Sequence, residues 1–149
     1  MIVVNNKPMS PQDYYRLNLI SIENNDKLQF TFMGMLQFLF EKKIIPKIMV
    51  LYNENYKEEF LPSGYCIYYI NEEAHSCQIS QICLCKEKQN QEYAKKFLDR
   101  IKQDFVDYDI TAHVKTYNTQ SQAFFAKNNF SFIEESEKER WKVEWRKKK

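Results

Sequence analysis

Histidine is the side chain best suited to proton transfer near neutral pH, and the chain contains two of them, His75 and His113. His113 lies in the segment 110–115, whose β-branched residues indicate a strand. A histidine in this setting can act as a general base toward an amine, or it can be a structural side chain. The residues alone leave both roles open.

The four cysteines, Cys66, Cys77, Cys83 and Cys85, fall between positions 66 and 85, in a stretch that otherwise indicates strands. Cys83 and Cys85 are spaced to share one face of a strand, whereas zinc sites usually carry paired cysteines on a tight turn. We therefore expect reduced, buried thiols and no metal site.

The elements that must position these side chains follow from residue periodicity. Strands are predicted at 2–4, 47–52, 65–70, 77–85, 110–115, 130–133 and 141–145; helices are predicted from Pro11 to the polar stretch 23–27 and at 30–42, 91–106 and 120–127. This order predicts an α+β domain with a mostly antiparallel mixed sheet flanked by helices. Because the helix 91–106 is a crossover, the strands on either side of it should form a central parallel pair.

Local signals refine these elements. Ser10 is expected to cap the first helix, with Pro11 at its first position. The residues 62–64, Pro-Ser-Gly, are expected to form a loop between two strands. In the strand 77–85, Ile82 and Leu84 are spaced to share one face. The odd-numbered Ile79 is out of phase with this alternation of apolar residues.

The segment 118–130 carries a recognisable pattern, N-T-Q-S-Q-A-F-F-A-K-N-N-F. It resembles the N-x-x-A-x-x-L-Y-x-K-x-G-F segment of the GCN5-related N-acetyltransferase (GNAT) superfamily. Asn129 stands where the superfamily usually has glycine, and asparagine readily adopts the left-handed conformation that ends a helix. Asn118 either contacts the cofactor or caps the helix that follows it.

A second resemblance lies between a predicted strand and the helix 91–106. The segment Gln89, Asn90, Gln91, Glu92, Tyr93 and Ala94 is similar to the superfamily's pyrophosphate loop, Q/R-x-x-G-x-G/A. Backbone N–H groups at a helix N-terminus suit phosphates. Glu92 replaces the middle glycine, which adds a side chain and a negative charge where an anionic ligand should approach.

Within the superfamily the chain looks most like the catalytic subunits of protein N-alpha-acetyltransferases. The stretches 13–18 and 36–39 are similar to parts of their first two helices, and Ala112-His113-Val114 is similar to an L-H-V strand motif. The resemblance implies a GNAT fold, acetyl-coenzyme A as cofactor and a protein or peptide N-terminus as acceptor. It also implies that His113 is the general base, that the backbone around Ile82 and Leu84 holds the pantetheine arm, and that 89–94 holds the pyrophosphate.

Three departures keep a second function open, the first being Glu92 in place of the loop glycine. Phe125 replaces a tyrosine that often protonates the departing thiolate, and Ser80 and Gln81 replace a carboxylate base. The chain is therefore either an active N-acetyltransferase or a non-catalytic subunit, a pseudoenzyme of the GNAT fold that binds other proteins of a larger assembly.

Length, charge and the distribution of apolar residues limit the possible functions. The 149 residues are enough for one domain, 1–149. A net charge of +2 from 22 basic and 20 acidic residues argues against nucleic acid as the main partner. The longest apolar run, 33–40, is too short to span a membrane. Without a leader-like N-terminus the default expectation is intracellular and cytoplasmic, with an organelle such as the mitochondrion left open.

Overall fold

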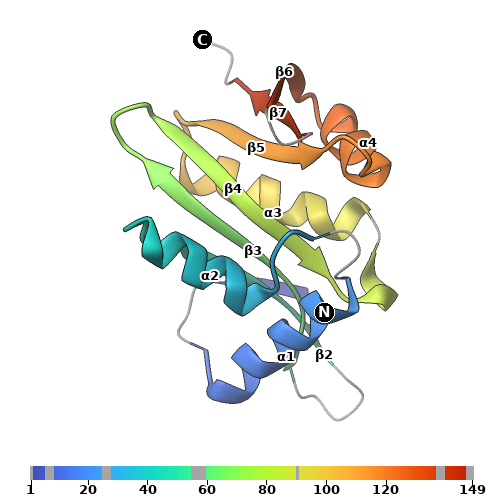
Figure 1. Ribbon diagram of the computed structural model, residues 1–149. Coiled ribbons are helices and arrows are strands. Elements are labelled where there is room, and N and C mark those ends of the chain that lie inside the picture. Colours follow the sequence, from blue (N-terminus) through green and yellow to red (C-terminus); the bar gives the residue numbers. More distant parts are fainter. Residues whose placement is uncertain are drawn as a thin grey trace.

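The structure is a computed structural model that describes residues 2–5, 9–24, 28–54, 60–89, 91–136 and 140–146 (Figure 1). In this part of the chain seven strands form one sheet, in the order β1-β2-β3-β4-β5-β7-β6. The strands are β1 (Ile2–Asn5), β2 (Lys47–Glu54), β3 (Phe60–Asn71), β4 (Ser76–Leu84), β5 (Asp109–Lys115), β6 (Ser131–Ser136) and β7 (Arg140–Trp145). The helices are α1 (Pro11–Glu23), α2 (Phe32–Glu41), α3 (Gln91–Asp104) and α4 (Thr119–Lys127), with a short 3₁₀ turn at Lys86–Lys88.

The predicted parallel pair lies at the centre of this sheet. Residues 76–79 of β4 pair in parallel with residues 109–112 of β5, and α3 connects the two strands. The other neighbouring pairs in the described part of the sheet are antiparallel. The α+β prediction, with its central parallel pair, is therefore confirmed.

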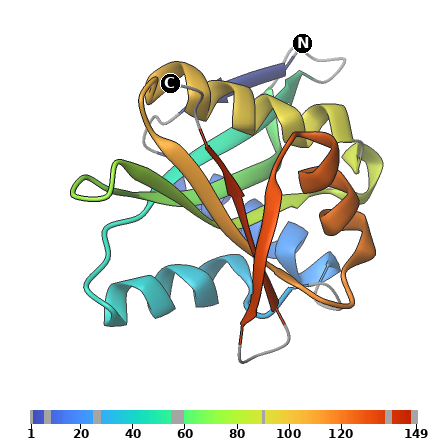
Figure 2. The same cartoon turned by 90° about the horizontal axis from the view of Figure 1, so that it is seen from above.

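Helices cover both faces of the sheet, and each face has its own core (Figure 2). On one face, α3 buries Phe97, Leu98 and Ile101 against the strands, and α4 adds further aromatic side chains. On the other face, α1 and α2 pack residues such as Leu17 and Phe32 against β2 and β3. No helix in the described ranges is long and apolar enough to cross a membrane.

The helix starts follow from capping residues. The Ser10 hydroxyl accepts a hydrogen bond from the backbone N–H of Asp13 at 3.1 Å, as the sequence predicts. The Thr31 hydroxyl accepts one from the N–H of Gly34 at 3.1 Å. Because Thr31 caps the helix, α2 begins at Phe32, and the predicted start at residue 30 is wrong by two residues.

The expected loop at 62–64 is also wrong, because these residues lie within β3. β2 pairs Leu51 with Gly64 and Tyr52 with Pro62, so the register shifts at this point. A bulge is one of the few places where a strand accommodates a proline, which has no N–H to donate. The strand therefore runs through a sequence that usually ends one.

Candidate active site

β4 and β5 diverge halfway along their length, and this opens the centre of the sheet (Figure 1). Their pairing ends at Ile79 and Ala112, although β4 continues to Leu84 and β5 to Lys115. Beyond Ile79, the edge of β4 that faces β5 has backbone polar groups with no partner in that strand. We call the opening between residues 80–84 and 113–115 the fork.

A β-bulge at Ser80 lies where the fork begins. The pairing of β4 with β3 passes from Ile79 directly to Gln81, so Ser80 has no partner residue in β3. The bulge reverses the alternation along β4. Ile79 belongs to the core beneath α3, and so do the even-numbered Ile82 and Leu84 that follow. The phase break visible at Ile79 in the sequence thus marks the start of the fork.

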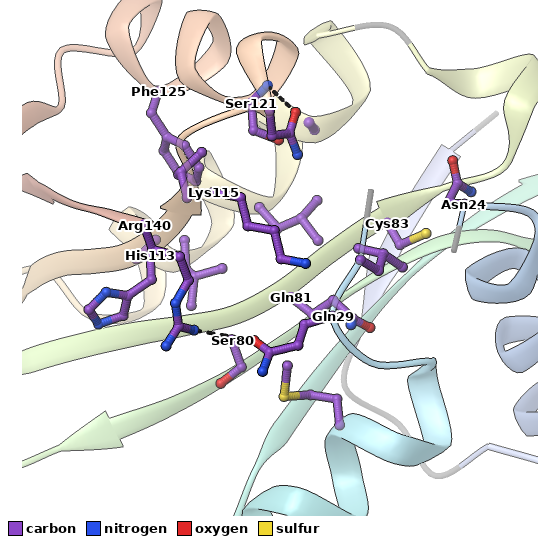
Figure 3. Close-up of a pocket in the computed structure, with 18 of the residues that line it drawn as sticks. Asn24, Gln29, Ser80, Gln81, Cys83, His113, Lys115, Ser121, Phe125 and Arg140 are labelled. Atoms are coloured by element: carbon purple, nitrogen blue, oxygen red, sulfur yellow. Dashed lines mark hydrogen bonds between the residues drawn. The ribbon is translucent and has the colours of Figure 1, made fainter. Parts of the chain in front are cut away.

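A cavity of about 460 Å³ occupies the fork (Figure 3). Its walls come from residues 79–84 and 112–115 of the diverging strands, from α2, from the start of α4 and from the connection between α1 and α2. Several residues that the sequence analysis assigned to catalysis or cofactor binding line it, namely Ile82, Leu84, Gln89, Ala94, His113, Asn118 and Phe125.

His113 lies in the wall of this cavity. Ala112 and Val114 are buried against the α3 side of the sheet, so strand alternation turns His113 to the opposite face, where it is exposed. Figure 3 shows its imidazole at one end of the cavity, beside the guanidinium of Arg140. A base that must accept a proton from an incoming molecule needs this kind of access.

The segment 89–94 lies where the chain passes from β4 into α3. The helix begins at Gln91, so the N–H groups of its first turn have no acceptor within the helix. Asn90 lies outside the described residues. Of the other side chains, Gln89 and Ala94 line the cavity, Glu92 lies on the exposed surface of α3 and Tyr93 packs against the core beneath that helix. The Gln91 side chain lies outside what the structure describes.

Asn118, which precedes α4, and Phe125, within that helix, both line the cavity. The Asn118 side-chain oxygen accepts a hydrogen bond from the N–H of Ser121 at 3.1 Å, so the capping role is the one that the structure shows. Phe125 is buried, with its ring centroid 4.9 Å from that of Phe130. Asn129 adopts a φ of 69°, the left-handed conformation expected where the superfamily has glycine.

Solved structures that superpose on this chain include acetyltransferases. The PaiA N-acetyltransferase from Thermoplasma acidophilum, in complex with coenzyme A, has a TM-score of 0.75 over 99% of each chain, at 12% identity. An acetyltransferase from Thermus thermophilus has a TM-score of 0.73 over 95% of this chain and 96% of its own, at 16% identity. The chain has the GNAT acetyltransferase fold.

A chain from the NatC complex bound to Gag peptide and CoA also shares the GNAT fold, with a TM-score of 0.69 over 99% of each chain at 10% identity. No protein-family profile and no curated protein matches the chain. At identities this low, the likeness to solved structures establishes the fold, and the chemistry must be argued from the site itself.

At the α3 end of the GNAT cavity, a group of side-chain amides joins three elements. Asn24, just after α1, donates from Nδ2 to the carbonyl of Ile20 at 2.9 Å and to that of Leu84 at 3.2 Å. Gln89 donates from Nε2 to the Leu84 carbonyl at 3.2 Å and to the Asn24 side-chain oxygen. The Leu84 carbonyl, assigned from the resemblance to the pantetheine arm, thus already accepts two hydrogen bonds, while the Leu84 side chain lines the cavity.

The charged side chains of the described cavity lining are basic. Lys115 and Arg140 line the cavity along with His113, and none of its described lining residues is an aspartate or glutamate. Arg140 donates from Nη1 to the Gln29 side-chain oxygen at 3.4 Å. Its Nε atom is buried and has no hydrogen-bond partner in the part of the chain that the structure describes. The GNAT cavity therefore favours negative charge at this end.

The cysteines are buried and free, as expected. Burial raises the pKa of the Cys83 thiol, which lines the cavity, to about 12, and it raises the pKa of Cys77 to about 12 as well. Protonated thiols are poor nucleophiles, so these side chains act as apolar packing at neutral pH. Among the described residues no cluster of metal-binding side chains occurs.

Sequence reasoning missed several polar residues of the cavity lining, among them Asn24, Gln29, Tyr69 and Arg140. Burial raises the pKa of Tyr69, so its phenol keeps its proton at neutral pH. None of these residues belongs to a local motif. They meet at the fork only through the order of the strands and the path of the α1–α2 connection, which short-range patterns do not encode.

Proposed function

We propose that the protein transfers an acetyl group from acetyl-coenzyme A to a primary amine, with a peptide N-terminus as the acceptor. The observation that carries this proposal is the fork, where a bulge in β4 and the divergence of β5 open a cavity that extends from Ala94 in α3 to His113. The likeness to a GNAT structure in complex with coenzyme A supports it.

The residues present fit acetyl-coenzyme A. The open edge of β4 provides backbone groups for the amides of a pantetheine arm, and Ile82 and Phe125 supply apolar contacts beside it. The first turn of α3 provides N–H groups for phosphates. Glu92, on the exposed side of that turn, lowers the expected affinity without blocking the cavity, because it is not among the described lining residues.

The chain's own groups supply the remaining chemistry. Acetyl-coenzyme A, when bound, supplies the activated thioester. His113 accepts a proton from the amine, whose nitrogen then forms the new bond to the acetyl carbon as the carbon–sulfur bond breaks. N–H groups on the open edge of β4 donate to the developing oxyanion. Phe125 has no proton for the departing sulfur, so we assign that proton to the Tyr69 phenol or to water.

The acceptor would enter beneath the connection between α1 and α2. Leu28 and Gln29 of this connection, together with Met35 and Phe38 of α2, form the wall of the cavity opposite the fork. This wall combines apolar side chains with an amide, a surface suited to an extended peptide. A chain of the NatC complex, which is bound to a peptide, shares the fold and supports this assignment.

We also propose an intracellular location. Acetyl-coenzyme A is made and used inside cells, and the four cysteines of this chain are free and buried. Unpaired cysteines in these numbers are typical of a reducing compartment.

A second candidate function is that of a non-catalytic subunit in a protein assembly. The observation that favours it is the apolar outer surface of α2 and the turn after it, where Met33, Phe40 and Ile45 are 48%, 79% and 88% exposed. Exposed apolar side chains gathered in this way often mark a protein–protein contact. This role and catalysis are compatible with each other, because the α2 surface and the fork are different parts of the molecule.

The experiment that tests the proposal has two steps. Calorimetric titration of the purified chain with acetyl-coenzyme A should give saturable binding, and addition of an equimolar mixture of peptides with free N-termini should release free thiol. Peptides whose N-termini are blocked serve as the control. If the chain neither binds acetyl-coenzyme A nor releases thiol, acetyl transfer is wrong and the non-catalytic function is favoured.

A further inference from the structure

Arg140 lies at the end of the cavity beside His113, where the acceptor amine would react, and among the described residues most of its N–H donors have no partner. A guanidinium has five N–H donors, and the structure shows one hydrogen bond from Arg140, to the neutral amide oxygen of Gln29 at 3.4 Å. The Nε atom is buried, and no described residue accepts a hydrogen bond from it. The ion pairs of the described residues, Arg100 with Asp104 and Arg146 with Glu144, do not include it.

A second cation lies directly across the strand pair. Lys115 of β5 is the register partner of Arg140 in β7, and both residues line the cavity. Like charges at directly opposed positions of an antiparallel pair are destabilising. The Lys115 ammonium lies 5.4 Å from the ring of Tyr117, a cation–π contact that supplies no anion to offset this repulsion. An anion held in the cavity would turn this repulsion into attraction.

The position of Arg140 separates such an anion from the phosphates of the cosubstrate. Asn24 bonds to Leu84 at the far end of β4, close to the start of α3, whereas Arg140 lies at the Ser80 end (Figure 3). Leu84 lies four residues after Ser80 along the strand, which corresponds to roughly 13 Å. Arg140 also lies beside His113, the proposed base. An anion at Arg140 would therefore belong to the acceptor.

We propose that the acceptor carries a carboxylate close to the amine that is acetylated, and that Arg140 binds this carboxylate. A planar guanidinium matches a carboxylate in geometry and charge, and hydrogen bonds between ionised groups are the strong ones. The carboxylate can be an acidic side chain in the first two residues of a peptide or the α-carboxylate of a free amino acid. This inference rests on the proposed acetyl transfer and adds to it a class of acceptor.

The test compares acceptors that differ only in charge. One pair of peptides has Asp or Asn at the second position, a second pair has Asp or Asn at the first, and a third pair is methionine and methionine amide. The wild type should have a kcat/KM about 10- to 100-fold higher for the acidic member of at least one pair. Preference in a peptide pair identifies an acidic side chain as the source, and preference in the third pair identifies the α-carboxylate.

Arg140→Gln should remove this preference mainly through KM. Arg140→Lys should retain part of this preference, because lysine keeps the positive charge but lacks the planar set of N–H donors of a guanidinium. Arg146→Gln is the matched control, since Arg146 is an exposed arginine just past the other end of β7, is paired with Glu144 and does not line the cavity. Equal rates for acid and amide in every pair, or a preference that survives Arg140→Gln, would overturn the inference.

Binding measurements separate this inference from the proposed function. Fluorescence anisotropy with labelled Asp and Asn peptides reports the carboxylate site even when no acetyl group is transferred. Tighter, Arg140-dependent binding of the acidic peptide in the absence of any transfer supports the anion site and overturns acetyl transfer. Acetyl transfer without any charge preference supports the proposed function and overturns the carboxylate site.

Discussion

Gly64→Ala tests the close contact between β3 and β4 beside the fork. A Cβ atom at Gly64 would lie 2.5 Å from Leu84 Cδ2, 2.8 Å from the carbonyl oxygen of Cys83 and 3.2 Å from the Leu84 Cα. The Leu84 side chain can rotate away, but the oxygen and the Cα belong to the backbone, so the two strands must move apart. Overpacking of this kind costs about 1–3 kcal/mol, and the backbone contacts place Gly64→Ala in the upper half of that range.

This loss of stability should be measurable by thermal unfolding. For a chain of this size each kcal/mol lowers Tm by about 2–4 °C, so we expect a decrease of about 5–10 °C. Because Leu84 also lines the cavity, Gly64→Ala should weaken the binding of acetyl-coenzyme A in the same preparation.

The other glycine of the chain provides the control. Gly34 lies in α2, where an added Cβ would lie 3.2 Å from the Thr31 hydroxyl oxygen and no closer than 3.6 Å to the next neighbour. Alanine favours a helix over glycine by up to about 1 kcal/mol, which offsets this mild crowding, so Gly34→Ala should leave Tm unchanged or slightly raised. If Gly64→Ala proves as stable as Gly34→Ala, the argument from contact distances is wrong.

Four further predictions concern the site. His113→Ala should lower turnover by roughly 10²-fold or more and leave the affinity for acetyl-coenzyme A unchanged by calorimetry; equal loss of both would point to a structural role instead. Glu92→Gly should tighten acetyl-coenzyme A binding about two- to fivefold. Glu92→Gln removes the negative charge but keeps the side chain, so it should give only the part of this gain that comes from the charge. Unchanged affinity in both variants would show that Glu92 does not hinder binding. Asn118→Ala should cost about 1 kcal/mol in denaturant unfolding, and Asn118→Ser, which keeps a capping oxygen, should recover most of it. Because burial raises the pKa of the Cys83 and Cys77 thiols, a thiol reagent at pH 8 should label these two only as fast as the protein unfolds, so rapid labelling of the folded chain would contradict their burial.

Much of the fold was predictable because the relevant signals are local. The spacing of apolar residues in 91–106 predicts α3, and a helix between two strands predicts that they are parallel neighbours. Asn118 precedes its helix by one residue, so its capping role was one of two stated alternatives. The phase break at Ile79 was also visible before the bulge at Ser80 explained it.

What sequence reasoning missed depends on long-range pairing. Residues 62–64 read as a turn because proline and glycine commonly end strands, and only the bulge opposite β2 shows why they continue one. Arg140 gains its position from the placement of β7 beside β5, although β6 comes between them in the sequence. Gln29 reaches Arg140 across a separation of 111 residues, which no local pattern encodes.

The connection between α1 and α2 touches both ends of the cavity. Asn24 is bonded to Gln89 where the chain enters α3, and Gln29, only a few residues later, is bonded to Arg140 at the acceptor end. A ligand that displaces either contact acts on the same short stretch of backbone, so occupancy of one end should alter the affinity at the other. Such coupling is reciprocal by thermodynamic necessity. We therefore expect each substrate to change the Kd of the other by the same factor in calorimetric titrations, with amide hydrogen exchange in residues 28–31 slowed by either substrate alone.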